Sequence, residues 1–228
     1  MATTDLADRR DPPAPADVAS RAAVIAVAVY IGAQVVADVT SVKIGVVFDR
    51  SVDMGTFVYP ITFTVRDVVH KVLGRSAART LVVTAAAVNL AMAAYLTWTA
   101  GVASDPGWGL GGEYSAVLAP VWRITLASIA AEVLSELADT EAYHWFVTRV
   151  TTRRQWARVL FSNSISVPID NVVFALGAFA WTLPWGVVWD VFTVNLVVKG
   201  LVTVASFPLI YLTADRSVEV PSRPPPRH

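Results

Sequence analysis

Two neighbouring apolar segments of the sequence contain carboxylates where a helix that crosses a membrane normally has none. Glu132, Glu136 and Asp139 lie in the first segment, and Asp170 lies in the second. By insertion scales, a charged residue at the centre of a bilayer costs about 2.5–3.5 kcal/mol, so such residues are usually kept for a pathway, a ligand or a partner charge. We therefore expect the function to reside in residues 128–174.

The spacing of the polar residues in this stretch predicts two polar helix faces, because positions three and four apart share one face of a helix. The first face comprises Ser128, Glu132, Ser135, Glu136 and Asp139. On the second face, Asn163 and Ser166 precede Asp170 at the same spacing. Pro168 should loosen this helix beside Asp170, since proline removes a backbone hydrogen bond.

The composition of the chain indicates which kind of element holds these residues in place. The chain has 228 residues, of which 55% are hydrophobic and 16% charged, and this indicates an integral membrane protein without room for a separate soluble domain. The net charge of zero gives no sign of a nucleic-acid partner. The sequence has no cysteine, which excludes thiolate metal sites and cysteine nucleophiles, and its three histidines have no metal-ligand spacing. We expect no metal and no cofactor.

Six apolar segments have about the 20 residues that a helix needs to cross a bilayer. Their approximate ranges are 21–40, 56–73, 80–102, 116–147, 159–183 and 186–214. The expected fold class is therefore all-α, a polytopic membrane protein with six transmembrane helices in one domain, residues 21–214. Residues 1–20 and 215–228 are rich in proline and charge and are expected to be disordered tails.

The distribution of basic residues predicts the orientation of these helices. Thirteen lysines and arginines fall on one side of the six-span arrangement, whereas Lys43 and Arg50 fall on the other. The positive-inside rule then places both termini in the cytoplasm.

Three short matches about a hundred residues apart suggest that the two halves are inverted repeats. The matched pairs are Asp38 with Asp139, Asp67 with Asp170, and Asn89 with Asn195. Halves of three spans each have opposite topology, and such repeats typically hold a binding site between them near the membrane midplane.

Three segments resemble the signatures of the queuosine precursor transporter family, also called the vitamin uptake transporter (VUT) family. They are GTFVYPITFTVRDVVHKVLG in the second span, SELADTEAYHWF in the fourth and WARVLFSNSISVPIDNVVFALGAF in the fifth. The resemblance extends over about residues 30–212. It implies a multi-pass protein of the cell inner membrane that imports 7-deazaguanines, such as 7-cyano-7-deazaguanine, as a secondary carrier without enzymatic activity.

The chemistry of a deazaguanine suggests which residues would contact it. A carboxylate can accept hydrogen bonds from the ring N–H and the exocyclic amine, an amide can bind the carbonyl, and an aromatic ring can stack on the flat heterocycle. The expected substrate contacts are therefore Asp170, Glu132, Asn163, Asn89, Asn195, Tyr59 and Phe174. Glu132, Glu136 or Asp170 could also carry a coupling proton, because burial favours the neutral form of a carboxyl group.

The remaining charged residues are expected to act as gates or ion pairs. This set comprises Arg66, Asp67, Asp139, Glu136 and Lys199. A simpler interpretation stays open, in which the basic residues neutralise the carboxylates and the hydroxyls and amides bind helices together.

Other functions and assemblies also stay open. The chain could be the substrate-binding membrane subunit of an uptake system with a separate energising module, or an intramembrane enzyme that uses Asp139 and Asp170 as a carboxylate dyad. Its partners are expected to be a purine-like small molecule and the lipid bilayer, and exposed Ala- and Gly-rich helix faces could support a homodimer.

Overall fold

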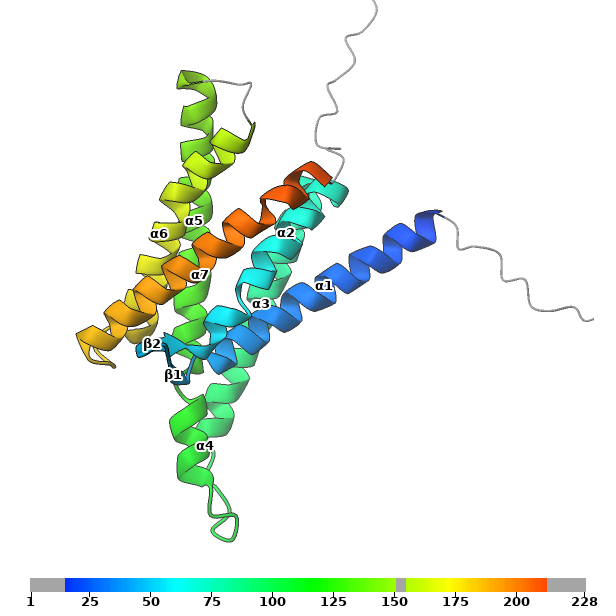
Figure 1. Cartoon of the computed structure of the whole chain (residues 1–228). Helices are drawn as coiled ribbons and strands as arrows, with labels where there is room; N and C mark the ends of the chain where they lie inside the picture. Colours follow the sequence, from blue (N-terminus) through cyan, green and yellow to red (C-terminus); the bar gives the residue numbers. More distant parts are fainter. Residues whose placement is uncertain (1–14, 151–154, 213–228) are drawn as a thin grey trace, which may run out of the picture.

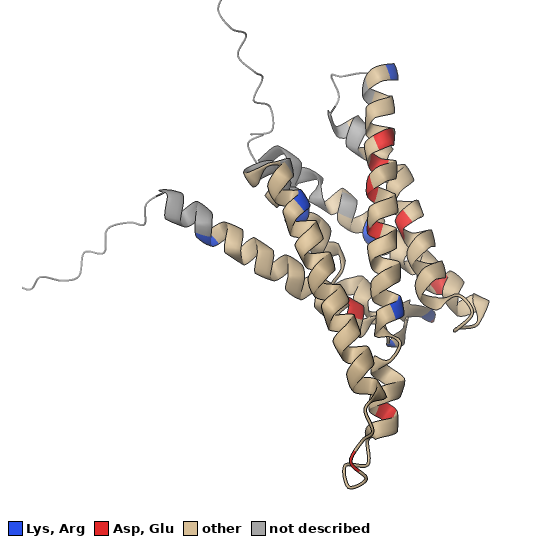
Figure 2. Cartoon of the chain, turned by 180° about the vertical axis from the view of Figure 1, so that it is seen from behind, with Lys and Arg blue, Asp and Glu red and all other residues tan. Residues whose placement is uncertain are grey.

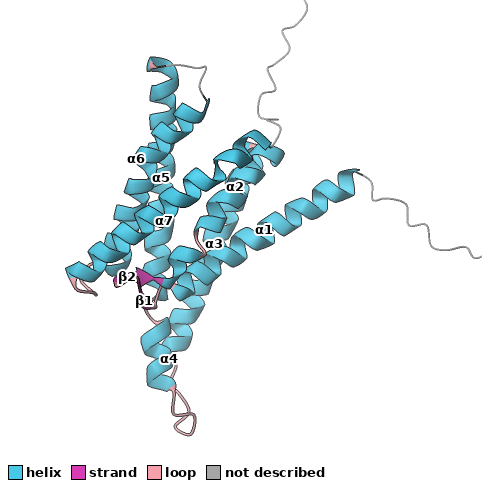
Figure 3. Cartoon of the chain, in the orientation of Figure 1, coloured by secondary structure: helices cyan, strands magenta, loops and turns pink. Residues whose placement is uncertain are grey.

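The fold is a bundle of long helices with a small β-hairpin at one end (Figures 1 and 3). The structure is a computed structural model that describes residues 15–150 and 155–212, and some side chains within these ranges are not described. The elements are α1 (Pro15–Thr40), β1 (Ile44–Val47), β2 (Arg50–Asp53), the 3₁₀ turn η1 (Met54–Phe57), α2 (Pro60–Leu73), α3 (Arg75–Gly101), α4 (Gly111–Leu118), α5 (Val121–Arg149), α6 (Gln155–Phe179) and α7 (Trp185–Leu212).

Within the described residues, five helical segments are long and apolar enough to cross a membrane. They are Arg21–Thr40, Ser76–Gly101, Gly111–Phe146, Leu160–Phe179 and Trp185–Val202. Many of their valines and leucines are exposed, as expected of side chains that face lipid rather than water. The protein is therefore a largely helical membrane protein, as composition predicts.

The segment expected as a second span differs from the other five. Residues 56–73 form part of η1 and the 14-residue helix α2. At about 1.5 Å per residue, α2 is about 21 Å long, shorter than the ~30 Å hydrocarbon core of a bilayer. Six complete spans therefore stay a prediction.

The N-terminal boundary of the bundle also differs from the expectation. Helix α1 begins at Pro15, within the expected tail, and proline suits a first helical turn because the N–H that it lacks has no partner there. Residues 1–14 and 213–228, which make up the rest of the expected tails, lie outside the described residues.

The hairpin was not predicted, and it adds two four-residue strands to the mostly helical fold that was expected. Strands β1 and β2 pair in antiparallel register, with Val47 opposite Arg50. Phe48 and Asp49 form the two-residue turn, and both have positive φ angles (50° and 59°), as a type I′ turn requires. The sequence lacks the Asn-Gly or Asp-Gly signal that usually marks this turn.

Contacts at the hairpin direct the chain back into the bundle. Arg50 forms an ion pair of 2.6 Å with Asp190 near the start of α7, and the Ser51 N–H donates to the same carboxylate at 3.2 Å. After β2, the chain turns through η1, which packs against α1 and α7. A short irregular segment thus precedes α2 in the interior of the bundle.

The helices form two groups. Helices α1, α2 and α3 pack together, as do α5 and α6 (Figure 1). Helix α3 also packs against α5, and α7 packs mainly against α6 with a smaller contact to α2. The start of α1, the junction of α2 and α3, and the ends of α5 and α7 lie at the upper end of Figure 1, whereas the hairpin lies toward the lower end. Seen from behind, several acidic residues follow one another along the upright helix α5, and the other acidic residues are spread over the remaining elements, as Figure 2 shows.

Candidate functional site

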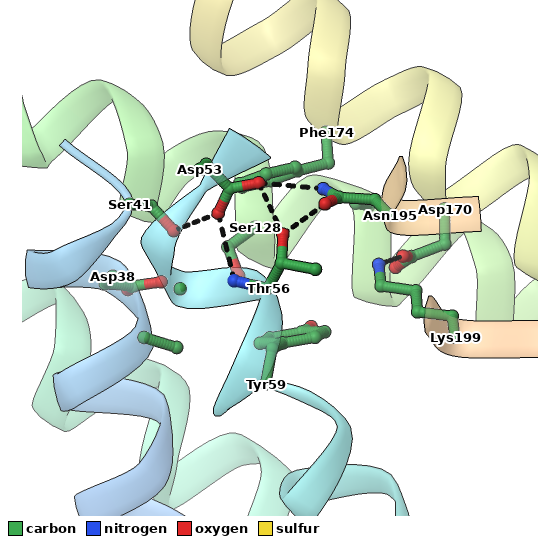
Figure 4. Close-up of a pocket in the computed structure, with 13 residues that line it drawn as sticks. Asp38, Ser41, Asp53, Thr56, Tyr59, Ser128, Asp170, Phe174, Asn195 and Lys199 are labelled. Carbon is green, nitrogen blue, oxygen red and sulfur yellow. Dashed lines mark hydrogen bonds and ion pairs between the residues drawn. The ribbon is translucent and has the colours of Figure 1, made fainter. Parts of the chain in front are cut away.

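A narrow cavity lies where the two groups of helices meet, and polar side chains surround it (Figure 4). Its volume is about 20 Å³, which is room for about one water molecule. The lining residues come from the end of α1 and the residue after it, from residues 53–59, which include η1 and are called the η1 segment below, and from α5, α6 and α7. They are Ala37, Asp38, Ser41, Asp53, Gly55, Thr56, Tyr59, Ser128, Ala131, Asp170, Phe174, Asn195 and Lys199.

Asp53 is the centre of a hydrogen-bonded cluster on one side of this cavity, and only 1% of its surface is exposed. Its Oδ1 accepts the Ser41 hydroxyl at 2.8 Å and the Thr56 N–H at 3.2 Å. Its Oδ2 contacts the Thr56 hydroxyl at 2.6 Å and accepts the Asn195 amide N–H at 3.0 Å. The carboxylate thereby caps η1, the role that favours Asp before a helical turn, and joins η1 to α1 and α7.

Asp170 and Lys199 form a buried ion pair on the other side of the cavity. The Lys199 ammonium also lies 5.0 Å from the ring centroid of Tyr59 and 6.0 Å from that of Phe174, within the range of cation–π attraction. The ion pair uses Asp170 Oδ2, and Oδ1 of this carboxylate is buried without a hydrogen-bond partner in the described structure. A buried acceptor of this kind suits a ligand that donates an N–H or O–H group.

A third buried carboxyl, Asp38, lines the cavity from α1. Its Oδ2 accepts the Thr125 hydroxyl of α5 at 2.9 Å. This bond joins the two helix groups next to the Asp53 cluster.

Glu132 belongs to a separate polar network that lies beside the cavity rather than in its lining. Its carboxylate accepts the Tyr30 hydroxyl at 2.8 Å and the Gln34 amide at 3.4 Å. Gln34 in turn accepts an N–H from Asn89 of α3 at 2.9 Å. The network binds α1, α3 and α5 together. Its geometry agrees with the simpler interpretation, in which polar side chains hold the helices together.

Further along α5 and α6, the polar contacts are more exposed. Arg66 of α2 forms an ion pair of 2.9 Å with Glu136, whose side chain is 55% exposed. Asp139 accepts the Ser166 hydroxyl at 3.2 Å. Asp139 and Asp170 therefore have different partners, Ser166 and Lys199 respectively.

The predicted site residues fall into three groups. Asp170, Asn195, Tyr59 and Phe174 line the cavity, together with Lys199, which was expected to be a gate or an ion-pair residue. Glu132 and Asn89 belong to the neighbouring network, and Asn163 lies two turns before Asp170 on α6, outside the lining. The side chain of Asp67 lies outside the described part of the structure.

Asp38, Asp53 and Thr56 line the cavity but were not predicted as site residues. Asp53 lies between two expected spans and Thr56 is the first residue of the second, so hydropathy singled out neither. One local signal was available, because an Asp three residues before a Thr can cap a helical turn.

Comparison with known families identifies the family of this chain. The family described as "Putative vitamin uptake transporter" matches residues 53–213, which is more than half of the chain. The chain belongs to this family. No curated protein and no solved structure matches the chain.

Membership of a vitamin uptake transporter family places the cavity in a membrane transporter. The matched region begins at Asp53 and extends through α6 and α7, so it contains Asp53, Thr56, Asp170, Asn195 and Lys199. It does not include α1, which supplies Asp38 to the same cavity, or Ser41, which follows α1 and also lines the cavity.

Proposed function

We propose that this vitamin uptake transporter family member is a secondary carrier of the cell inner membrane that imports 7-deazaguanines, such as 7-cyano-7-deazaguanine. The observation that carries the proposal is the free Oδ1 of Asp170, which is buried in a cavity bounded by aromatic rings and an ammonium group. The resemblance of the second-, fourth- and fifth-span motifs to queuosine precursor transporters supports the choice of substrate.

The edge of a deazaguanine is complementary to these groups. Its ring N–H and exocyclic amine would donate to Asp170, and its carbonyl oxygen would accept from Lys199 or Asn195. Tyr59 or Phe174 would stack on the flat ring system. Asp170 can serve two partners because the ion pair with Lys199 occupies one oxygen and leaves the other free.

The cavity volume of about 20 Å³ is far smaller than a purine. Binding therefore requires the elements around the cavity to move apart. The described conformation corresponds to a closed state of the carrier. Both termini lie in the cytoplasm in this proposal, in accordance with the positive-inside rule.

Uptake of labelled 7-cyano-7-deazaguanine into proteoliposomes tests the function. Purified wild-type protein should accumulate it without an added ATPase, and Asp170→Asn should reduce the initial rate at least tenfold while the protein still reaches the membrane. Asp190→Asn is the matched control, since it removes the carboxylate of a more exposed ion pair at the bundle end.

Three results would count against this proposal. Uptake that continues unchanged in Asp170→Asn would show that Asp170 does not bind the substrate. Uptake that appears only when an ATPase partner is added would favour the alternative of a substrate-binding subunit. If a different vitamin or purine stabilises the purified protein against heating, that compound would replace 7-cyano-7-deazaguanine as the proposed cargo. A ligand that binds only the folded state must stabilise it.

A further inference from the structure

The tip of the hairpin exposes a large apolar side chain that the rest of the described chain leaves uncovered. Phe48 is 97% exposed, and Val46, two residues before it, is 73% exposed. The inner side of the hairpin is packed, since Val52 is completely buried and Gly45 lies against the side chain of Met54. The hairpin thus has one side that belongs to the protein interior and a tip that presents apolar surface outward.

Phe48 also has a backbone conformation that suits other residues better. Its φ angle of 50° lies in the left-handed region, which glycine, asparagine and aspartate adopt more readily than an aromatic residue. In water, a phenylalanine at this position would combine an unfavourable backbone with unfavourable exposure of its ring. Transfer of the ring from water into an apolar surrounding offsets these costs.

The contact between the hairpin and α7 indicates the level at which the hairpin lies in the membrane. Strand β2 packs against α7, and Arg50 pairs with Asp190 at 2.6 Å. Asp190 is the sixth residue of the candidate span Trp185–Val202. A rise of 1.5 Å per residue places it about 7 Å inside the start of that span. The hairpin is therefore attached within the span rather than beyond its end.

The surface of α7 at this level is typical of a membrane interface. Trp185 and Trp189 are both more than half exposed, and amphipathic indole rings concentrate where the hydrocarbon core meets the headgroups. The partly exposed Arg50 also suits the headgroup region better than the hydrocarbon core. In Figure 1, α4 and the loop before it extend further toward the lower end than the hairpin does, so the hairpin is not the outermost part of the molecule.

A basic side chain beside the tip complements the charge of lipid headgroups. Lys43 is exposed and forms no ion pair within the described residues. Its carbonyl oxygen accepts the Met54 N–H at 3.0 Å, and this bond fixes Lys43 at the base of the hairpin. A lysine at a membrane interface extends its ammonium group toward the lipid phosphates while its carbon chain covers apolar surface.

We propose that the hairpin binds the bilayer surface, with the Phe48 ring and Val46 inserted among the lipids and the Lys43 ammonium on a lipid phosphate. The partner is a phospholipid, because the tip continues the surface that α7 presents to the membrane with its exposed tryptophans. This proposal does not depend on the identity of the cargo. Since β2 ends at Asp53, which lines the cavity, a bilayer contact at the tip would help to position part of the cavity lining.

Spin labels on the hairpin of the full-length protein test this contact without any substrate. The sequence has no cysteine, so one nitroxide label can be attached at Phe48→Cys, and Asp49→Cys in the same turn is the matched control. In vesicles of phosphatidylcholine and phosphatidylglycerol, oxygen should relax the label at position 48 at least threefold more than the label at position 49. A water-soluble nickel chelate should show the opposite preference.

Val46→Cys should behave like Phe48→Cys, and it provides a second position if the first variant does not fold. Two outcomes would overturn the proposal. If the nickel chelate relaxes the labels at positions 46 and 48 as strongly as the label at position 49, the tip lies in water. If neither oxygen nor the chelate reaches positions 46 and 48, protein covers the tip, and a second copy of the chain is its partner instead.

Charge reversal tests the lysine. In the labelled Phe48→Cys protein, Lys43→Glu should at least halve the preference for oxygen over the chelate, because anionic headgroups repel a carboxylate. The effect should be larger with phosphatidylglycerol than in phosphatidylcholine alone. Glu113→Lys is the control, since it reverses an exposed charge on α4 and should leave the preference unchanged. An equal preference with Lys43 and with Lys43→Glu would refute the phosphate contact.

Discussion

Lys199 shows how one residue can hold several elements of the cavity lining together. Its ammonium pairs with Asp170 and faces three aromatic rings, those of Tyr59, Phe63 and Phe174. Only 6% of its surface is exposed. Removing one partner of such a pair leaves a buried charge without compensation, and this usually costs about 3–5 kcal/mol of stability.

We therefore expect Lys199→Met to lower the melting temperature of the detergent-solubilised protein strongly. The double variant Lys199→Met/Asp170→Asn should recover much of this loss, because it removes both charges and retains the side-chain volume. Arg50→Met is the control, since it breaks a more exposed pair that should contribute less than about 1 kcal/mol. A double variant that is no more stable than Lys199→Met would show that the pair is not the source of the effect.

At the scale of elements, the η1 segment brings the Asp53 cluster into the bundle because it can approach α1 closely. A Cβ atom added at Gly55 would lie 2.0 Å from Ser41 Oγ and 2.4 Å from the carbonyl oxygen of Ala37. The second neighbour is backbone and cannot rotate away. Glycine is thus required here by space, although its φ angle is not in the left-handed region.

Gly55→Ala should destabilise the protein by about 1–3 kcal/mol, the usual effect of overpacking, and should also reduce transport because it displaces Asp53 and Thr56. The measurements are thermal unfolding and proteoliposome uptake. Gly32→Ala provides the comparison, since a Cβ there meets nothing within 4 Å and alanine favours a helix. Equal melting temperatures for the two variants would mean that η1 does not pack against α1 as described.

The elements also show what could be predicted from the sequence. Long apolar runs predicted α1, α3, α5, α6 and α7, because crossing a bilayer imposes length and hydrophobicity on a helix. The hairpin and η1 carry no such constraint, and long-range contacts with α1 and α7 fix them instead. Asp170 was found because a carboxylate in an apolar run is conspicuous, whereas Asp53 was missed because it becomes buried only when the chain folds back.

At the scale of the whole molecule, the cavity lies between two groups of helices, as expected of a site between two repeats. The inverted repeat itself stays a prediction. The paired positions have dissimilar surroundings. Asn195 bonds to Asp53 in the cavity, whereas Asn89 bonds to Gln34 outside its lining. Likewise, Asp38 is buried against Thr125, whereas Asp139 is partly exposed beside Ser166. Superposition of residues 21–101 on residues 121–212 after a half-turn in the membrane plane is the direct test.

The orientation of the molecule in the membrane determines which end of the bundle faces the cytoplasm and from which side the cavity would be reached. The hairpin, with Lys43 and Arg50 nearby, lies toward one end of the bundle, and the end of α5 at Arg149 lies at the other (Figure 1). The sequence has no cysteine, so single cysteines can be introduced without background. A cysteine at Asp49 should react with a membrane-impermeant maleimide in intact cells, because this turn is exposed and is expected to face the outside. A cysteine at Arg149 should react only after the membrane is permeabilised, and the reverse pattern would place the hairpin and the outer entrance of the cavity in the cytoplasm.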